Sequence, residues 1–414
     1  MIEKYYSGVI EQIYNRIGKE TRNIVMANYS NDFSIENLEV IRRYQSNEDN
    51  VFFAYSEFSY NTLVGAYEPF LDIICNMHRR FIGGSFDDFQ KECGVYYLHR
   101  QVLNSYYETG ECFREETVLL NEVAYEQRRM TMAIADMLKK LSEVKPLMIV
   151  INRFQMASKS SIETIKYLID NPCANIGIVL GVNAIVKGTD STVEVWDRIV
   201  ESLEDRSAIY YIGSAGPLKN NVKTTNDDEL YITMNFEQSI QEASNIMEFL
   251  DFEQARRGCR IIEHKLKFED AWIDEKSLRR FYMVYARTSV LLGEMSKAIE
   301  LTNEYKALIP ENDSEHYLSL YYFMKGTCYM YQGKLEKAGN SAKSAYDYAV
   351  LAEDDTLIFK AELLSVMIKM SGWYNIFFCV QDIPVSDEII EKLIKHGYRN
   401  HLAHIYIYAY DNSR

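Results

Sequence analysis

The pattern of apolar and polar positions changes once along the chain. In the first half, short apolar runs rich in β-branched and aromatic residues alternate with helical patterns. This alternation is typical of a parallel sheet covered by helices, because each strand needs a crossover before the next parallel strand. The predicted strands span residues 24–27, 51–55, 147–151, 176–181 and 208–212. The first half is therefore predicted to be an α/β domain.

Helical periodicity fills the remaining length. Residues 67–140, between the second and third predicted strands, are predominantly helical in period. A stretch rich in Gly, Asn, Thr and charge follows the last predicted strand and is typical of a linker. From Phe236 the helical pattern continues nearly unbroken to the end of the chain. We therefore divide the chain into an α/β domain at 1–213, a linker at 214–235 and an all-α region at 236–414.

The helical region repeats itself. Small or aromatic residues occur with the five-point spacing of a tetratricopeptide repeat at Gly326, Tyr329, Gly333, Ala338 and Ala345. Small residues let two helices approach each other closely, and the glycine between them supplies a helix-ending conformation. Equivalent places about 40 residues away are occupied by Ala286, Gly293, Ala298, Ser365 and Gly372. The spacing predicts a TPR-like α-solenoid. Because no polar capping helix ends it, we expect either a fragment or an end covered by a partner.

Composition narrows the range of functions. The chain has 45 Lys and Arg residues against 60 Asp and Glu residues, a net charge of −15, which argues against direct nucleic-acid binding through clustered basic surface. Its seven cysteines lie far apart without zinc-ligand spacing, as is typical of reduced thiols. The amino-terminal segment lacks the features of a secretion signal, and no apolar run approaches the roughly 20 residues that span a bilayer. We expect a cytoplasmic protein that is not embedded in a membrane.

Three segments of the first half follow one another as in a known class of ATPase. The first strand continues as IVMANYSNDFSIENLEVIRRY, in the place of a strand, a phosphate loop and a helix. The residues retained from the next two motifs of the class are Tyr67, Pro69, Phe70, Gln155, Ala157 and Ser161. On these residues, the stretch 3–212 resembles the P-loop domain of the signal-transduction ATPases with numerous domains (the STAND class). The class includes large bacterial transcriptional activators with helical-repeat sensors, so the resemblance implies a role in signalling.

The phosphate loop of that class is degenerate in this chain. A loop of the form G-x-x-x-x-G-K-[ST] binds nucleotide because its glycines turn backbone N–H groups toward the phosphates, its lysine neutralises them and its hydroxyl holds magnesium. The aligned residues here are Asn28, Phe33, Ser34 and Ile35. No glycine occurs between Gly18 and Gly65, so a shifted alignment does not restore the loop.

The acidic end of the third strand is degenerate as well. In the class, one carboxylate there holds magnesium through water, and its neighbour activates the attacking water. Asn152 and Arg153 stand at these positions, and Asn183 stands at the sensor position after the fourth strand. Losing the lysine, the hydroxyl and both acids removes several contacts of roughly 1.5–3 kcal/mol each. We predict no hydrolysis, no catalytic residue, no cofactor and no metal; weak adenine-nucleotide binding without magnesium stays open.

Two further groups of residues are candidates for binding. His401 and His404 are three residues apart in the last helical pattern, but no carboxylate or cysteine stands at a matching turn, so we interpret them as packed or solvated side chains rather than metal ligands. Tyrosines recur along one repeat at Tyr317, Tyr321, Tyr322, Tyr329 and Tyr331. We expect most of them to pack between helices and the rest to line a groove for a protein partner.

Two functional hypotheses follow. In the first, the chain is a non-catalytic regulatory protein whose pseudo-ATPase domain is a scaffold and whose repeats bind another protein. In the second, it is the sensor half of a larger ligand-gated regulator of transcription or of cyclic-dinucleotide signalling, which retains weak nucleotide binding. The missing phosphate ligands motivate the first hypothesis, and the uncapped last helix motivates the second. Oligomerisation is compatible with both.

Overall fold

The computed structural model of the chain divides into two compact units. It describes residues 2–29, 38–46, 50–59, 63–114, 116, 118, 120–183, 186–187, 190–213, 215, 223–224, 235–268, 273–312, 314–375 and 387–411. The first unit comprises Met1–Arg114 and Asn121–Glu269, and the second comprises Glu115–Leu120 and Asp270–Arg414. The first unit thus extends beyond the predicted α/β domain and includes α9 (Phe236–Glu248) and α10 (Phe252–Phe268). Most of the predicted linker lies outside the described residues.

Five parallel strands form the sheet of the first unit in the order β2-β3-β4-β1-β6. They are β1 (Ile24–Tyr29), β2 (Phe52–Glu57), β3 (Leu147–Asn152), β4 (Ile176–Asn183) and β6 (Ile209–Ile212). All five predicted strands are confirmed, because each coincides with one of these strands. The two-residue strands β5 (Val186–Lys187) and β7 (Lys223–Thr224) pair separately.

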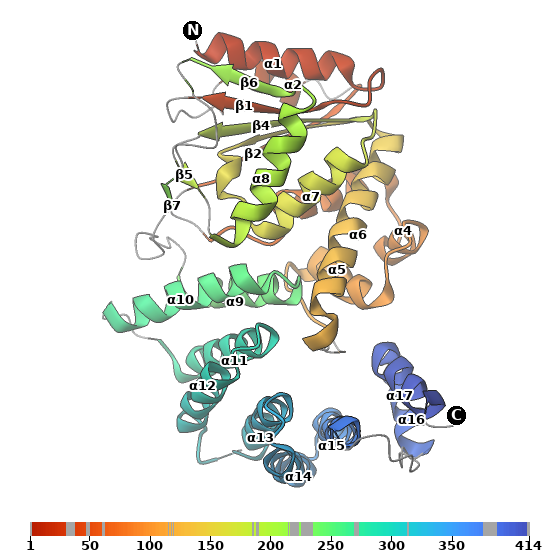
Figure 1. Ribbon diagram of the computed structural model, residues 1–414, viewed down its shortest axis with the longest axis vertical. Helices are drawn as coiled ribbons and strands as arrows, with labels where there is room; N and C mark the ends of the chain where they lie inside the picture. The colour runs from red at the N-terminus through yellow and green to blue at the C-terminus, as the bar shows by residue number, and fades with distance from the viewer. Residues whose placement is uncertain are drawn as a thin grey trace. The chain divides into compact units, whose positions relative to one another are not determined.

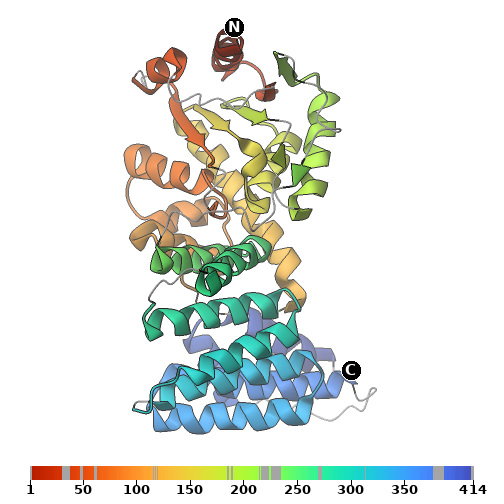
Figure 2. The ribbon, with the colours of Figure 1, turned by 90° about the vertical axis from the view of Figure 1, so that its left-hand side faces the viewer.

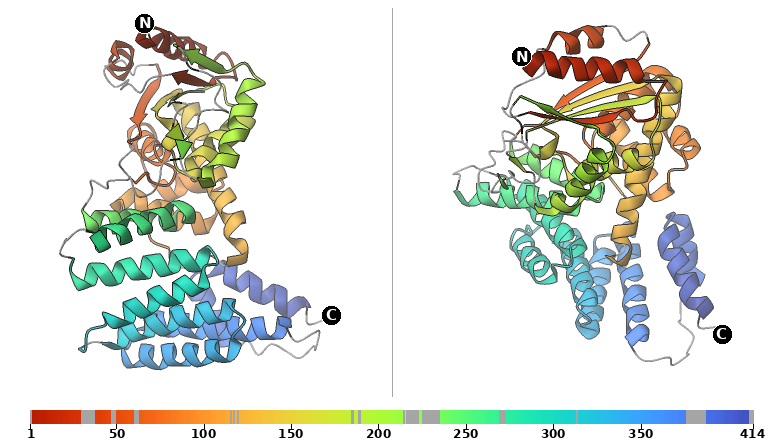
Figure 3. Two further views of the ribbon diagram at one scale, coloured as in Figure 1. Left: turned by 60° about the vertical axis from the view of Figure 1, so that its left-hand side comes forward. Right: turned by 45° about the horizontal axis from the view of Figure 1, so that its top comes forward.

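Helices cover both faces of this sheet (Figure 1). On one face lie α1 (Ile2–Arg16) and α2 (Glu39–Ser46), whose apolar side chains share a core cluster with alternate residues of the strands. The helical spacing of Tyr6, Val9, Ile10 and Ile13 places these four side chains on one stripe of α1, and all are buried there. On the opposite face lie α7 (Lys159–Asp170) and α8 (Asp190–Glu204), as Figure 3 also shows.

The stretch between β2 and β3 is helical, as the sequence predicts. Its elements are α3 (Phe70–Met77), η1 (His78–Ile82), α4 (Phe86–Glu92), α5 (Tyr97–Thr109), η2 (Leu120–Glu122) and α6 (Val123–Val144). A short 3-10 helix, η3 (Phe154–Met156), follows β3. None of the helices in the described parts of the chain is long and apolar enough to cross a membrane.

The second unit is helical. Its helices are α11 (Glu275–Leu291), α12 (Met295–Ala307), α13 (Ser314–Tyr331), α14 (Leu335–Leu351), α15 (Asp355–Asn375), α16 (Asp387–Lys395) and α17 (Arg399–Asp411). Figure 2 shows the cyan to blue helices lying side by side. Gly293 and Gly333 have φ of 78° and 71°, the left-handed conformation that ends α11 and α13. A Cβ atom on Gly326 would lie 3.0 Å from Leu364 Cδ2, so the glycine lets α15 pack closely against α13.

One predicted repeat position is wrong. Gly372 was expected to end a helix, as Gly293 and Gly333 do, but α15 continues through it to Asn375. A glycine inside a helix costs roughly 1 kcal/mol relative to alanine, an amount that tertiary contacts can override. A glycine alone is therefore not sufficient to predict where a helix ends.

A short segment that precedes α6 belongs to the second unit. The Glu116 carboxylate accepts a hydrogen bond from the backbone N–H of His401 at 2.9 Å, and the same oxygen lies 2.7 Å from His401 Nδ1. Both side chains are buried. The backbone N–H of Leu120 donates to the Tyr331 hydroxyl at 3.3 Å. We call the segment 115–120 the strap; its described residues Glu116 and Leu120 help to hold α17 and α13.

Candidate functional site

The positions aligned with the catalytic acids lie at one edge of the sheet. Tyr29, Glu57 and Asn152 are the last residues of β1, β2 and β3, and Arg153 follows directly. The carboxyl ends of parallel strands share an edge, which is where open α/β sheets usually bind ligands. We call these four residues the carboxyl-edge network.

Hydrogen bonds within the protein occupy the amide of Asn152. Its Oδ1 accepts from the Tyr29 hydroxyl at 2.6 Å, and its Nδ2 donates to Glu57 Oε1 at 3.2 Å. Asn152 and Tyr29 are fully buried. A carboxylate at position 152 would offer no donor to Glu57 and would place a second negative charge beside it. The asparagine is therefore suited to binding its neighbours rather than a metal.

Arg153 neutralises the remaining acid of this network. Its guanidinium lies 3.1 Å from Glu57 Oε1 and donates to the carbonyl of Phe58 at 3.3 Å. The Tyr55 hydroxyl donates to the other carboxylate oxygen of Glu57. Arg153 has φ of 54°, a conformation uncommon for residues other than glycine, and it turns the chain from β3 into η3. The second predicted acid position thus carries a cation that is paired within the protein.

Aromatic side chains fill the space beside Asn152. A Cβ atom on Gly181 of β4 would lie 2.4 Å from the Tyr6 hydroxyl and 2.8 Å from Asn152 Oδ1, so only glycine fits there. The Tyr6 and Tyr29 rings meet edge to face, with centroids 6.3 Å apart. Burial, followed by the neighbouring Tyr29, raises the pKa of Tyr6 well above its usual value, so the hydroxyl stays neutral.

The other predicted nucleotide positions are only partly described. Asn28 is fully buried within β1, while Phe33, Ser34 and Ile35 lie outside the described residues. The backbone N–H of Asn183, at the sensor position, donates to Gln155 Oε1 at 3.3 Å. In the described parts of the chain, no three His, Cys, Asp or Glu side chains are grouped to hold a metal ion.

Two motif segments used in the alignment contact each other. The Ser161 hydroxyl donates to the backbone carbonyl of Glu68 at 2.7 Å, and the backbone N–H of Tyr67 donates to Ser160 Oγ at 3.0 Å. Tyr67 has φ of 57° and is buried. The serines at the start of α7 therefore hold the Y-x-P-F segment in place.

An acidic pocket of about 450 Å³ lies beside the end of β2 in the first unit. Four carboxyl groups and three aromatic rings line it, from Glu57, Glu68, Asp72, Glu242, Phe58, Tyr106 and Phe249. No Lys or Arg is among its lining residues. We call it the acidic pocket.

Two of its carboxyl groups converge on Gly65. The backbone N–H of Gly65 donates to Glu68 Oε2 at 2.9 Å, and a Cβ atom there would lie 2.9 Å from Glu242 Oε1. Burial raises the pKa of Glu68. Burial, followed by the charges of Glu68 and Asp72, raises the pKa of Glu242 to about 7. Glu242 therefore changes its protonation near neutral pH.

The five predicted tyrosines of the second unit are all at least half-buried. The Tyr321 hydroxyl accepts from Lys325 Nζ at 2.7 Å, and the ring of Tyr322 stacks on Tyr348. Arg279 lies over the Tyr317 ring, and Lys337 lies over the Tyr329 ring. Tyr331 accepts from the strap, as described above. These side chains make contacts within the unit: the Tyr321 and Tyr322 rings meet edge to face, and Tyr329 and Tyr331 pack against one apolar core cluster.

A different apolar group of the second unit is exposed. Tyr346, Val350 and Leu351 of α14 have 38%, 45% and 67% of their surface exposed. Tyr346 and Val350 are four residues apart, and such residues share a helix face. Sequence reasoning missed this group because it followed the tyrosine-rich helix α13 rather than the outer face of α14.

No protein-family model matches the sequence, and no curated protein matches it. The chemistry of the described residues is therefore the basis for assigning a function.

Proposed function

We propose that the chain is a non-catalytic regulatory protein, in which a P-loop-like domain without nucleotide chemistry acts as a scaffold and the helical unit binds another protein. The observation that carries the proposal is the carboxyl-edge network. Asn152 and Arg153 replace the two acids of the resembling class, and their polar groups bond to Tyr29 and Glu57. A buried, hydrogen-bonded network resists rearrangement, because each broken bond leaves an unsatisfied group.

The resemblance to the STAND class gains support from the fold. The sheet is parallel throughout, with β1 between β4 and β6, and the retained serine of α7 contacts the Y-x-P-F segment. A phosphate loop in this domain would follow β1, at the edge that the network occupies. The proposed domain therefore keeps the framework of a nucleotide switch without its ligands.

Protein binding is proposed for the helical unit because of its exposed apolar side chains. The apolar side chains of Val350 and Leu351 are exposed to water, and their burial against a partner would lower the free energy. Packed helices that present a rigid surface are a common platform for this kind of recognition. We place the contact on the outer face of α14, with the predicted tyrosines supporting it from within.

Equilibrium dialysis of the full chain against labelled ATP with magnesium tests the first part of the proposal. We expect no binding in the micromolar range and no turnover above a mock purification. Asn152→Ala serves as the control for a contaminating ATPase, because turnover that is unchanged in this variant does not come from the network. Micromolar binding that Asn152→Ala weakens would refute the proposal.

The ligand-gated sensor remains a second candidate, and the cavities of the first unit favour it. The acidic pocket is large enough for a small molecule, since ligand pockets commonly measure about 300–1,000 Å³. A change in accessibility of α9 on addition of a ligand, measured by hydrogen exchange, would distinguish a sensor from a passive scaffold.

A further inference from the structure

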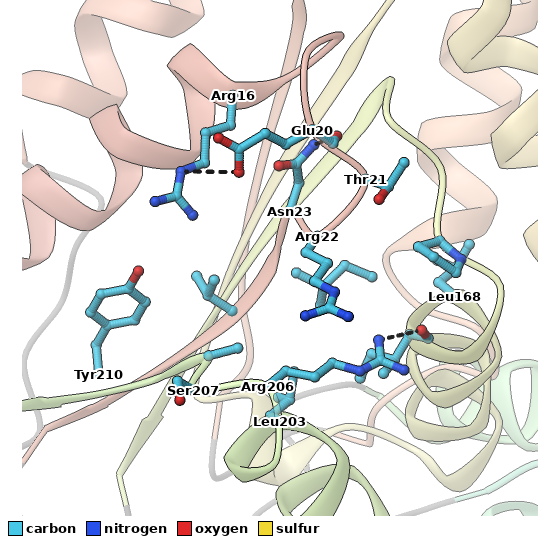
Figure 4. A pocket seen from close by; sticks show the side chains of 15 residues that line it. Arg16, Glu20, Thr21, Arg22, Asn23, Leu168, Leu203, Arg206, Ser207 and Tyr210 are labelled. Atoms are coloured by element: carbon cyan, nitrogen blue, oxygen red, sulfur yellow. Dashed lines mark hydrogen bonds and ion pairs between the residues drawn. The ribbon is translucent and has the colours of Figure 1, made fainter.

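The first unit has a second cavity, at the amino ends of β1 and β6 (Figure 4). Its volume is about 180 Å³. The lining residues come from the end of α1, the start of β1, the end of α7 and the turn between α8 and β6. Because three of them are Arg16, Arg22 and Arg206, we call this cavity the arginine pocket.

The arginine pocket carries a net positive charge within an acidic protein. Glu20 is the one carboxylate among its lining residues, and it lies 3.6 Å from Arg16 Nε. Arg206 donates to the backbone carbonyl of Ile169 at 2.6 Å, which orients the guanidinium without neutralising it. Among the residues that the structure describes, no carboxylate pairs with Arg22 or Arg206. Two of the three cations are therefore available to an anion.

Asn23 fixes the loop that carries Arg22. It is fully buried, and its Nδ2 donates to the carbonyls of Glu20 at 2.6 Å and Ala174 at 3.1 Å. Its Oδ1 is buried and has no hydrogen-bond partner among the described residues. The neighbouring Arg22 is exposed on this anchored loop. A binding group held by a buried side chain needs less ordering when a ligand arrives.

The volume of the arginine pocket limits the size of the ligand that it can hold. A volume of about 180 Å³ is below the roughly 300–1,000 Å³ that is common for ligand pockets, so the pocket favours a small ligand over an adenine nucleotide. Leu168, Pro172 and Leu203 form an apolar part of the wall beside the arginines. This combination fits a short carbon skeleton that ends in an anionic group.

We propose that the arginine pocket binds a small organic oxyanion, a phosphate or a carboxylate. Guanidinium groups match the paired oxygens of both groups and stay charged at all physiological pH values. The site lies at the sheet edge opposite the carboxyl-edge network, so it does not depend on the absence of nucleotide chemistry. The proposal adds an effector site to the scaffold function.

Thermal unfolding of the full chain with two probes tests this proposal. The probes are 10 mM glycerol 3-phosphate and 10 mM malate, each compared with sodium chloride at equal ionic strength. A ligand at about ten times its Kd raises Tm by roughly 1.5–2.5 °C in a chain of this size. A rise with glycerol 3-phosphate alone assigns a phosphate, a rise with malate alone assigns a carboxylate, and a rise with both assigns the shared oxyanion chemistry.

Two variants and a matched control complete the experiment. Arg22→Gln removes an exposed charge, so we expect an unchanged Tm without ligand and loss of most of the ligand-induced rise. Arg206→Gln is measured by calorimetric titration below its Tm, with an expected loss of at least tenfold in affinity. Arg43→Gln, on α2 outside the pocket, should keep the full response. No rise with either probe, or an equal rise in Arg22→Gln and Arg43→Gln, overturns the proposal.

Discussion

The two edges of the central sheet differ in what occupies them. At the carboxyl edge, Asn152 is hydrogen-bonded to both Tyr29 and Glu57, and a Cβ atom on Gly181 would clash with Asn152 and Tyr6. At the amino edge, three arginines surround a cavity. Open parallel sheets usually bind ligands at the carboxyl edge, so the proposed oxyanion site at the amino edge would be an exception to that rule. A parallel sheet has both edges whatever its sequence, and the side chains at each edge decide whether a ligand can bind there.

The packing of the carboxyl edge is tested most strongly at Gly181. Gly181→Ala places a Cβ atom 2.4 Å from the Tyr6 hydroxyl, which should lower the free energy of unfolding by about 3 kcal/mol. Gly8→Ala is the matched control, because Gly8 is exposed on α1 and has no atom within 4 Å of the added Cβ. It should stabilise the chain by about 0.5–1 kcal/mol. Equal urea midpoints for the two variants would show that the edge is loosely packed.

The hydrogen bond between Asn152 and Glu57 is tested by restoring an acid at the end of β3. Asn152→Asp keeps the side-chain shape but removes the donor to Glu57 and adds a charge beside it, so we expect a loss of about 2 kcal/mol at pH 8. The new carboxyl group should be easier to bury when protonated, so the loss should shrink at pH 5.

Asn15→Asp, the same change on the exposed side of α1, should alter urea unfolding by less than about 0.5 kcal/mol. A gain of magnesium-dependent ATP binding in Asn152→Asp would contradict the view that the network has replaced the nucleotide site.

The acidic pocket gives the carboxyl edge a pH dependence. The pKa of Glu242 is raised to about 7 in the folded chain, above its usual 4.5, so folding favours the protonated form. The stability from this group is complete below about pH 4.5 and is lost as the pH rises toward 7. Glu242→Gln should therefore stabilise the chain by roughly 1–2 kcal/mol at pH 8 and have little effect at pH 4.5.

Urea unfolding across this pH range checks the prediction. The exposed Glu237, near the start of the same helix, provides the matched substitution Glu237→Gln, for which the two pH values should give the same small difference. A stabilisation by Glu242→Gln that does not depend on pH would mean that the carboxylate is solvated.

The smallest effect on stability is expected at the amino edge. Glu20 and Arg16 are partly exposed and 3.6 Å apart, so Glu20→Gln should change the free energy of unfolding by less than about 0.5 kcal/mol. The same substitution frees Arg16 and removes the one acid that lines the arginine pocket. Calorimetric titration with glycerol 3-phosphate or malate should then show a severalfold higher affinity, and a lower affinity would exclude Arg16 from the site.

The strands could be predicted because they are buried on both faces. Every residue of β3 and β4 is buried, and such strands read as continuous apolar runs whatever their neighbours are. Helix ends were predicted only in part. Gly293 and Gly333 end helices as predicted, but Gly372 does not, because a glycine permits a left-handed turn without requiring one.

The candidate site could be predicted only in part. Asn152 and Arg153 were identified from their place at a strand end, but their partners Tyr29 and Glu57 lie on other strands. Both cavities combine residues that are distant in sequence, such as Glu68 with Glu242 and Arg22 with Arg206. Neither a motif nor a local period predicts these long-range contacts, because they depend on strand order and on how the helices pack.

The strap has a practical consequence for anyone who dissects this molecule. The polypeptide passes from one unit to the other at residues 114–115, 120–121 and 269–270. A cleavage in the polar stretch 214–235 therefore yields neither folding unit intact. An expressed carboxyl-terminal piece would leave His401 without its buried acid, while the amino-terminal piece would lose α9 and the wall of the acidic pocket. After a cut in this stretch, the two fragments should therefore remain associated and separate only when they are denatured.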